Sequence, residues 1–134
     1  MRTISLTVVL SLLGKGKAAD LKYVELAARD ISDTVEEGFK IIVEKSTVPV
    51  KAAESISTIL GVNKKPGVEY QVLSNPEFLA EGSAITDLLH AERVLIGGER
   101  SERGEVAVQA LSWIYQHWIP KGTMVRSLCE IGKC

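Results

Sequence analysis

The sequence predicts an α/β fold, a partial Rossmann-like parallel sheet with helices on its faces. Short apolar runs rich in β-branched residues alternate with longer segments in which apolar residues recur at helical spacing. The expected order is strand, helix, strand, helix, strand, turn, strand, helix, which is typical of parallel strands joined by right-handed crossovers. Ligands bind such sheets beyond the carboxyl ends of the strands, so polar residues at those positions are the first candidates for a site.

Four apolar runs are expected to form the strands. The first lies within residues 4–13, where an arginine followed by apolar residues also resembles the start of a secretory signal. A buried strand over residues 6–12 is favoured, because the run is too short to span a bilayer and no small-x-small cleavage site follows it. The other expected strands cover residues 39–43, 70–73 and 93–96.

Three amphipathic helices are expected between and after these strands. Pro49 fits the first position of the second helix and Gly61 its end, while Ser101 is placed to cap the third. Trp113 and Tyr115 lie off the apolar stripe that we assign to the third helix. The predicted buried faces are Leu21, Val24, Ala28 and Ile31; Ala52, Ile56, Ile59 and Leu60; and Ala107, Ala110, Leu111, Ile114 and Trp118.

The composition is that of an ordinary globular protein. The 134 residues suggest one domain, and 16 basic against 17 acidic residues leave a net charge of −1, so neither nucleic acid nor a membrane is expected as a partner. The only cysteines, Cys129 and Cys134, form no disulfide framework, which favours a reducing, cytoplasmic location. The two histidines are not clustered with other metal-binding residues, so no metal site is expected.

A glycine-rich run at residues 14–19 has the pattern Gly-x-Gly-x-x-Ala after an expected strand and before an expected helix. Glu44 ends the next apolar run, where an acid that binds a ribose would stand in a dinucleotide-binding unit. The residues alone therefore predict a dinucleotide-binding loop. Against this, two lysines are unusual in so tight a turn, and short glycine patterns are common by chance.

The segment from Ser74 to Gly82 follows the third expected strand. Asn75 is a favoured helix cap, Pro76 a favoured first helical residue and Gly82 a natural stop, so a helix of one or two turns is expected. Glu77 and Glu81 would then share a face, with Cβ atoms about 6 Å apart. The functional hypothesis is a polar ligand held by both carboxylates, or an acid/base pair; the alternative is a solvated surface turn.

A second polar pair stands at the carboxyl end of the second expected strand. The hydroxyls of Ser46 and Thr47 and the free N–H groups of the following helix start could contact a phosphate or a sugar. Simple capping of the helix by a local hydroxyl explains the same residues. Both this pair and the Glu77 segment lie beyond carboxyl ends of strands, and their convergence is the physical case for a site.

The chain closely resembles the UDP-glucose 6-dehydrogenases of the eukaryotic type. Residues 16–23, 44–50, 73–82 and 93–98 carry the likeness, which extends over about 14–122. The most specific part is the string Leu-Ser-Asn-Pro-Glu-Phe-Leu-Ala-Glu-Gly at 73–82. Members of this family oxidise the C6 alcohol of UDP-glucose to the carboxylate of UDP-glucuronate with NAD⁺, through an aldehyde and a cysteine thioester that is then hydrolysed.

The resemblance implies roles for individual residues. Ser46, Thr47, Val48 and Glu81 would contact the cofactor NAD. Glu77 would be the catalytic carboxylate that helps water to attack the thioester, with Thr47 helping to place that water. The substrate UDP-glucose would be bound by Glu77, Phe78, Leu79, Ala80 and Glu81.

The chain also departs from the family pattern. Residues 1–13 and 123–134 match nothing in it, and the glycine run at 14–19 resembles a family loop before a helix, not the dinucleotide fingerprint. The Gly-Gly-Ser-Cys motif of the nucleophile has no counterpart, so the nucleophile is assigned neither to Cys129 nor to Cys134. The resemblance thus implies a truncated form that covers the later half of an NAD-binding domain and is inactive alone.

An alternative is a non-enzymatic fragment that associates with full-length UDP-glucose 6-dehydrogenase subunits or modulates their oligomer. Two observations favour this alternative. The aromatic residues Trp113 and Tyr115 lie off the apolar stripe of the third expected helix, and residues 45–51 resemble a mobile segment tied to allosteric switching in animal members of the family.

Overall fold

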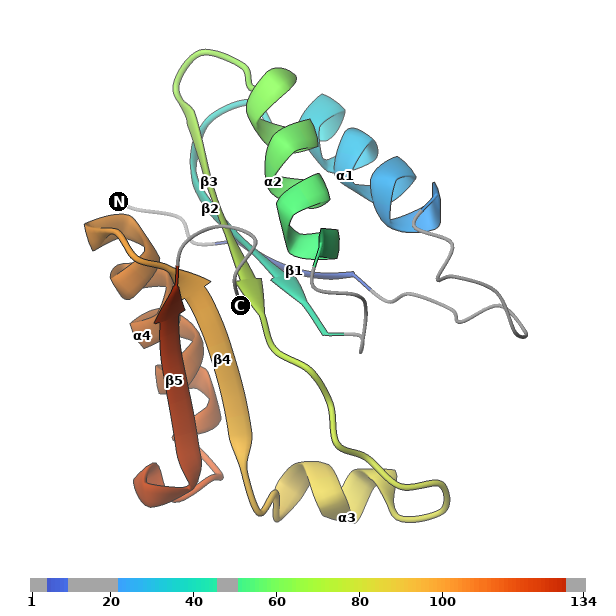
Figure 1. Ribbon diagram of the computed structural model, residues 1–134, viewed down its shortest axis with the longest axis vertical. Helices are drawn as coiled ribbons and strands as arrows, with labels where there is room; N and C mark the ends of the chain where they lie inside the picture. Colours follow the sequence, from blue (N-terminus) through green and yellow to red (C-terminus); the bar gives the residue numbers. More distant parts are fainter. Residues whose placement is uncertain (1–4, 10–21, 46–50, 130–134) are drawn as a thin grey trace.

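The computed structural model describes residues 5–9, 22–45 and 51–129. These residues form a sheet with helices on both faces, as the sequence predicts (Figure 1). The elements in chain order are β1 (Ser5–Val9), α1 (Lys22–Thr34), β2 (Gly38–Glu44), α2 (Lys51–Val62), β3 (Val68–Ser74), α3 (Ala84–Leu89), β4 (Val94–Glu99), α4 (Glu102–Tyr115), a 3₁₀ turn (Lys121–Thr123) and β5 (Met124–Cys129).

In the described part of the chain the sheet has five strands, which follow the order of the sequence, β1-β2-β3-β4-β5. The predicted parallel pairing is confirmed for β1 with β2 and for β2 with β3. The strand β5 also pairs in parallel with β4. The β3–β4 pair differs, because it is antiparallel and its ladder contains the single residue pair Ser74 and Gly97. The sheet is therefore mixed and mostly parallel.

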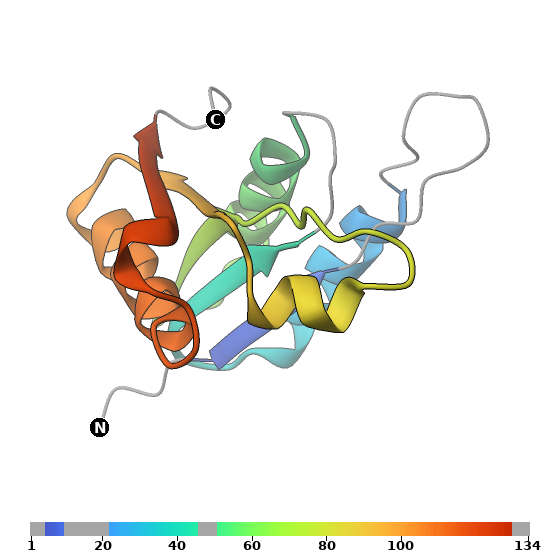
Figure 2. The same cartoon turned by 90° about the horizontal axis from the view of Figure 1, so that it is seen from below.

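Each face of the sheet buries its own apolar core. Alternation along β2 sends Ile41 and Val43 toward α4 and Ile42 toward α1 and α2. Figures 1 and 2 show the two helices α1 and α2 side by side over the β1–β3 part of the sheet, with α4 packed at the β4–β5 end. The predicted faces of α1 and α2 are confirmed, since Val24, Ala28, Ala52, Ile56 and Leu60 are buried; Leu21 lies outside the described residues.

The predicted face of α4 is partly wrong. Ser101 caps this helix as expected, with its Oγ accepting from the Gly104 N–H at 3.0 Å. Ala107 and Leu111 are buried as expected, but Trp118 lies beyond the helix and is 40% exposed. The buried stripe instead comprises Gly104, Ala107, Val108, Leu111, Ser112 and Tyr115.

Two further differences concern the ends of strands. The fourth strand was expected to end at residue 96, but β4 continues through Gly97 and Gly98 to Glu99. Gly98 fits there because Val108 and Leu73 lie so close that no Cβ could be accommodated: one built on Gly98 would meet their side chains at 2.7 and 2.9 Å. The strand β5 was not predicted, because residues 124–129 show no clear alternation. Its backbone pairs with β4 along all six residues of the strand.

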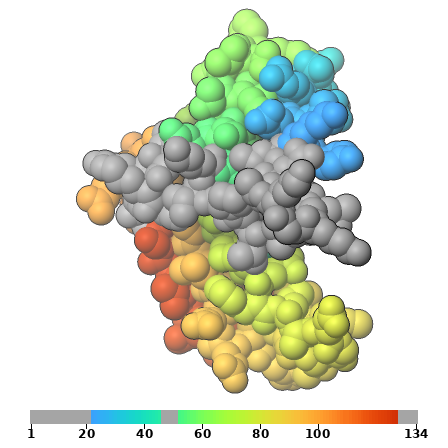
Figure 3. Space-filling view, turned by 45° about the vertical axis from the view of Figure 1, so that its right-hand side comes forward, coloured from blue at the N-terminus to red at the C-terminus, as the bar shows by residue number. Residues whose placement is uncertain are grey.

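The segment between β3 and β4 contains α3 and extends from the body of the molecule. Figure 3 shows it, in yellow and gold, at the end of the molecule opposite α1 and α2. None of the helices in the described part of the chain is long and apolar enough to cross a membrane.

Candidate functional site

The reversal of direction between β3 and β4 brings four parts of the chain to one edge of the sheet. Lys45 directly follows β2 and Asn75 directly follows β3, so both lie at the carboxyl ends of parallel strands. Since β4 runs the opposite way, its first residue, Val94, starts at this same edge. The helix α4 then returns toward it, which places Tyr115, its last residue, beside Asn75.

Asn75 is the centre of a hydrogen-bond network at this edge. It is 1% exposed, and both polar atoms of its side chain have partners. Its backbone N–H donates to the Glu44 carbonyl at 2.8 Å, and its side-chain Nδ2 donates to the Leu95 carbonyl at 2.8 Å. Its Oδ1 accepts from the Tyr115 hydroxyl at 2.7 Å and from Lys45 Nζ at 3.2 Å. One side chain thus joins β2, β3, β4 and α4.

Lys45 links this buried network to Glu77. Its Nζ lies 2.9 Å from the Tyr115 hydroxyl and 3.5 Å from Glu77 Oε1. The Lys45 side chain is 15% exposed and that of Glu77 32%, so the ion pair is sheltered on the lysine side and open on the carboxylate side. An unpaired ammonium so little exposed would be costly, and the carboxylate offsets part of that cost.

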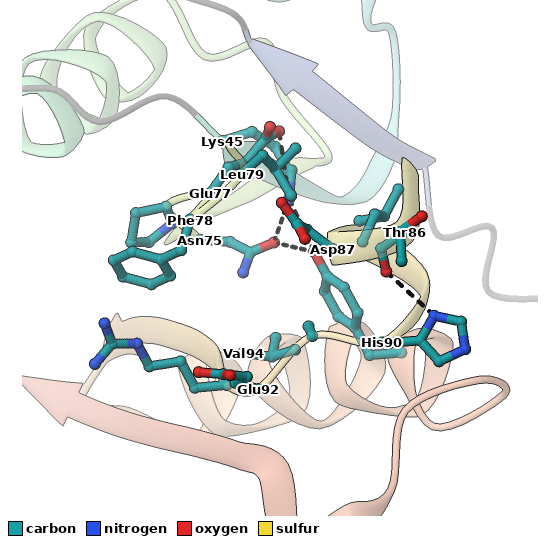
Figure 4. A pocket seen from close by; sticks show the side chains of 15 residues that line it. Lys45, Asn75, Glu77, Phe78, Leu79, Thr86, Asp87, His90, Glu92 and Val94 are labelled. Carbon is teal, nitrogen blue, oxygen red and sulfur yellow. Dashed lines mark hydrogen bonds and ion pairs between the residues drawn. The ribbon is translucent and has the colours of Figure 1, made fainter. Parts of the chain in front are cut away.

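A cavity of about 370 Å³ opens beside this ion pair. Figure 4 shows Lys45, Asn75 and Glu77 together along one side of it, with Glu92 and Val94 opposite. This volume is toward the lower end of the range of ligand pockets, enough for a sugar-sized group. Its lining also includes Phe78, Leu79, Thr86, Asp87, His90, Arg93 and Tyr115.

The outer wall of the cavity is shaped by two local contacts. The guanidinium of Arg93 stacks on the ring of Phe78, 4.7 Å from its centroid. Asp87 Oδ2 accepts from the Ala80 N–H at 3.0 Å and from the Ser83 hydroxyl at 2.8 Å. The backbone N–H of Ala80, and then the Ser83 hydroxyl, lower the pKa of Asp87 because they favour its charged form.

The predicted helix at the start of this segment is wrong. Residues 75–80 have no regular secondary structure, and the helix α3 begins only at Ala84. The physical reason is that the Asn75 side chain binds Leu95, Tyr115 and Lys45 and is not available as a helix cap. The helical face that Glu77 and Glu81 were expected to share is therefore absent.

The predicted site residues have different positions. Glu77, Phe78 and Leu79 line the cavity, whereas Ala80 and Glu81 are exposed and are not part of its lining. Gly82 adopts a positive φ of 86° in the turn after them, a conformation that favours glycine. The remaining candidates, Ser46, Thr47 and Val48, lie outside the described residues, as does the glycine run at 14–19.

Sequence reasoning did not assign a role in the site to Asn75, Tyr115 or Arg93. For Tyr115 a signal was present, since it follows Ala107 and Leu111 at intervals of four residues and so continues a helical stripe. No such signal marks Arg93, because its place beside Phe78 depends on the turn between β3 and β4. Among the described residues, no group of three or more His, Cys, Asp or Glu side chains could hold a metal ion.

Glu44 is a second buried polar residue at this edge. It is 1% exposed, and its Oε1 has no hydrogen-bond partner. Burial raises its pKa from 4.5 to about 7, because the charged carboxylate is poorly solvated there. Alternation along β2 places it on the same face as Ile42, toward α1 and α2, and it does not line the cavity.

Comparison with known families shows to which family this chain belongs. Residues 6–119 match the family model of the UDP-glucose/GDP-mannose dehydrogenase family, NAD binding domain. This match includes residues 6–13, which the motif resemblance did not cover. The chain belongs to this family. The chain is 68% identical over 108 residues to UDP-glucose 6-dehydrogenase of Drosophila melanogaster and 60% identical over 109 residues to that of Rattus norvegicus. Both matches cover 81% of this chain, and the chain spans 22% of the length of each relative.

Solved structures of the UDP-glucose/GDP-mannose dehydrogenase family share the fold. A UDP-glucose dehydrogenase from the hyperthermophilic archaeon Pyrobaculum islandicum superposes with a TM-score of 0.71 at 29% identity, over 97% of this chain and 29% of that one. A GDP-mannose dehydrogenase from Pseudomonas aeruginosa, in a ternary complex, gives the same TM-score at 28% identity, over 96% and 29%. The mixed sheet described above is thus a fold of this family.

Proposed function

We propose that this chain forms the sugar-facing part of the NAD-binding domain of a UDP-glucose 6-dehydrogenase, in which UDP-glucose is oxidised to UDP-glucuronate. The observation that carries the proposal is the Glu77 carboxylate, which lies against a cavity at the carboxyl edge of the sheet and is paired with Lys45 at 3.5 Å. Support comes from the identity of 60 to 68% with animal enzymes of that name.

The described residues fit a nucleotide-bearing ligand. Open α/β sheets bind nucleotides at the carboxyl edge, and the cavity lies at that edge of β2 and β3. Arg93 gives its lining a cation, which suits a phosphate group. NAD, when bound, would supply the acceptor for the hydride removed from the sugar; we propose that Ser46, Thr47, Val48 and Glu81 contact it.

In this proposal Glu77 acts as a general base. Its open side faces the cavity, where a carboxylate oxygen can accept the proton of a water molecule that attacks the oxidised C6 carbon. Lys45 holds the other side of the carboxylate and balances its charge. Phe78 and Leu79 provide the apolar part of the lining, while Thr47 would orient the water and Ala80 and Glu81 would complete the substrate contacts.

We also propose that the 134-residue chain alone does not turn over UDP-glucose. The thioester route needs a thiol nucleophile in the site, and no cysteine of this chain stands in a Gly-Gly-Ser-Cys context. Incubation with UDP-glucose and NAD⁺ should therefore produce no NADH. A cytoplasmic location is also part of this proposal.

Calorimetric titration of UDP-glucose into the chain tests the proposed site. We expect measurable binding that Glu77→Ala weakens about tenfold to a hundredfold, the loss expected for one hydrogen bond to a charged group. Glu69→Ala is the matched control, because Glu69 also pairs with a cation, Arg103 Nε at 3.1 Å, but lies outside the cavity. The absence of binding, or equal losses in the two variants, would contradict the proposal.

A second candidate function is association with longer members of the family. The observation that favours it is Trp113, which is 63% exposed on α4 although large aromatic side chains are usually covered. Co-purification of this chain with a full-length family enzyme, lost in Trp113→Ser, would support this candidate. No change in the assembly or the rate of that enzyme would remove it.

A further inference from the structure

The hydroxyl of Tyr115 is a buried polar group at the site that the proposed chemistry does not use. The side chain is 7% exposed and comes from α4, 40 residues along the chain from Asn75. Its O–H donates to Asn75 Oδ1 at 2.7 Å, because that oxygen can only accept. Its own oxygen then has lone pairs free to accept from Lys45 Nζ at 2.9 Å.

The number of hydrogen-bond donors on Lys45 explains the effect of its contact with the Tyr115 hydroxyl. An ammonium group has three N–H donors and no acceptor. Three acceptors surround Nζ: the Tyr115 hydroxyl at 2.9 Å, Asn75 Oδ1 at 3.2 Å and Glu77 Oε1 at 3.5 Å. With two donors used by buried oxygens, the third is available to the carboxylate at the cavity wall.

The two buried acceptors are themselves held in place. Asn75 is fixed by its bonds to the Leu95 and Glu44 carbonyls. The Tyr115 ring packs in the core beneath α4 and lies 5.3 Å from the Trp118 ring. A lysine normally carries its charge on a flexible stem, but here the protein fixes the end of that stem.

We infer that Tyr115 is a positioning residue, which acts through Lys45 to hold the Glu77 carboxylate at the wall of the cavity. The inference rests on the proposed function, since it assigns Glu77 its role there. A base must lie within hydrogen-bond reach of the proton it removes, and supporting hydrogen bonds are what keep such a group in place. Tyr115 itself need not touch the substrate.

Nitrogen-15 NMR of the lysine side chains in the full chain tests the arrangement directly. An ammonium held by several acceptors exchanges its protons slowly with water, so Lys45 should give a side-chain signal near neutral pH, assigned by its loss in Lys45→Arg. In Tyr115→Phe, which keeps the ring and removes only the hydroxyl, the exchange of this signal should be at least tenfold faster. Tyr23→Phe is the matched control, because Tyr23 is 64% exposed on α1.

Slow exchange that persists in Tyr115→Phe would overturn the inference. If that variant does not fold, the wild-type chain decides: cross-peaks between the Lys45 ammonium protons and the Tyr115 ring are expected, and their absence would overturn it. A structural role alone would lower the stability of Tyr115→Phe without changing the Lys45 signal in the folded state.

Titration with UDP-glucose separates this inference from the proposed function. Tyr115→Phe and Lys45→Met should each weaken binding severalfold, and the double variant should lose no more than the larger single loss, because both act on one network. Fully additive losses would contradict the inference alone. A wild-type chain that shows the protected Lys45 signal but does not bind UDP-glucose would contradict the proposed function alone.

Discussion

Asn75 Nδ2 lies 2.8 Å from the carbonyl oxygen of Leu95, and this hydrogen bond joins β3 to β4 just past the point where their antiparallel ladder ends. The ladder has only one residue pair, so the side chain extends a backbone connection that is otherwise minimal. The same side chain accepts from Tyr115 and Lys45. The edge that carries the candidate site is thus held together by one asparagine.

Replacement of Asn75 should therefore be costly. Asn75→Ala leaves the Leu95 carbonyl and the Tyr115 hydroxyl without these partners at a buried position, and we expect the free energy of unfolding to fall by about 2–4 kcal/mol. Urea denaturation measures this loss. Asn63→Ala serves as the control, since the exposed Asn63 amide bonds only within its own helix end, to Ile59, and should cost at most about 1 kcal/mol. Similar losses in the two variants would refute the central role of Asn75.

The pH dependence of stability should report the burial of Glu44. Its pKa is raised from 4.5 to about 7 in the folded state, so between these values the folded chain binds more protons than the unfolded chain. Stability must then fall as pH rises through this window, by up to about 3 kcal/mol for a shift of this size. Glu44→Gln removes the titrating group and should remove this part of the pH dependence. If the free energy of unfolding depends on pH in the same way in the wild type and in Glu44→Gln, the raised pKa of Glu44 is contradicted.

Two glycine-to-alanine changes should have opposite effects although both lie in helices. A Cβ on Gly104 would clash with the Glu99 carbonyl oxygen, so Gly104→Ala must displace backbone at the start of α4 and should destabilise the chain by more than about 2 kcal/mol. Gly61 in α2 has open space around it and a φ outside the positive range, so Gly61→Ala should stabilise it by about 0.5 kcal/mol or more. Thermal unfolding of both variants checks the pair, and a stabilised Gly104→Ala would contradict the described packing.

Much of the fold follows from local sequence patterns. The faces of α1 and α2 are visible as apolar residues at helical spacing, and β2 as an apolar run. The face of α4 was placed wrongly because two apolar stripes overlap on it, and burial under Val94 and Ile96 selects the stripe that ends in Tyr115. The strand β5 depends on pairing with β4, which is a nonlocal cause that its own sequence does not show.

The edge of the sheet that carries the candidate site could be predicted from the sequence, but the arrangement of its side chains could not. Two polar segments after strands predict which edge of the sheet to examine. Lys45 and Glu77, one residue from each segment, meet there, whereas Ser46 and Thr47 lie outside the described residues. The geometry of the pair Glu77 and Glu81 was wrong, because helix-capping preference is local whereas Asn75 satisfies partners from three distant segments. Such competition between local and long-range hydrogen bonds is decided only in the folded chain.

The most direct test is an NMR titration of the isotopically labelled chain with UDP-glucose, followed through its backbone amide signals. If the cavity beside Glu77 is the sugar site, saturable shifts should centre on Glu77, Phe78, Leu79 and Arg93, which line it. The outer surface of α1 and α2, represented by Arg29 and Thr58, should not respond. Shifts confined to that outer surface, or no saturable shift at all, would contradict the assignment of a nucleotide-sugar site to this edge of the sheet.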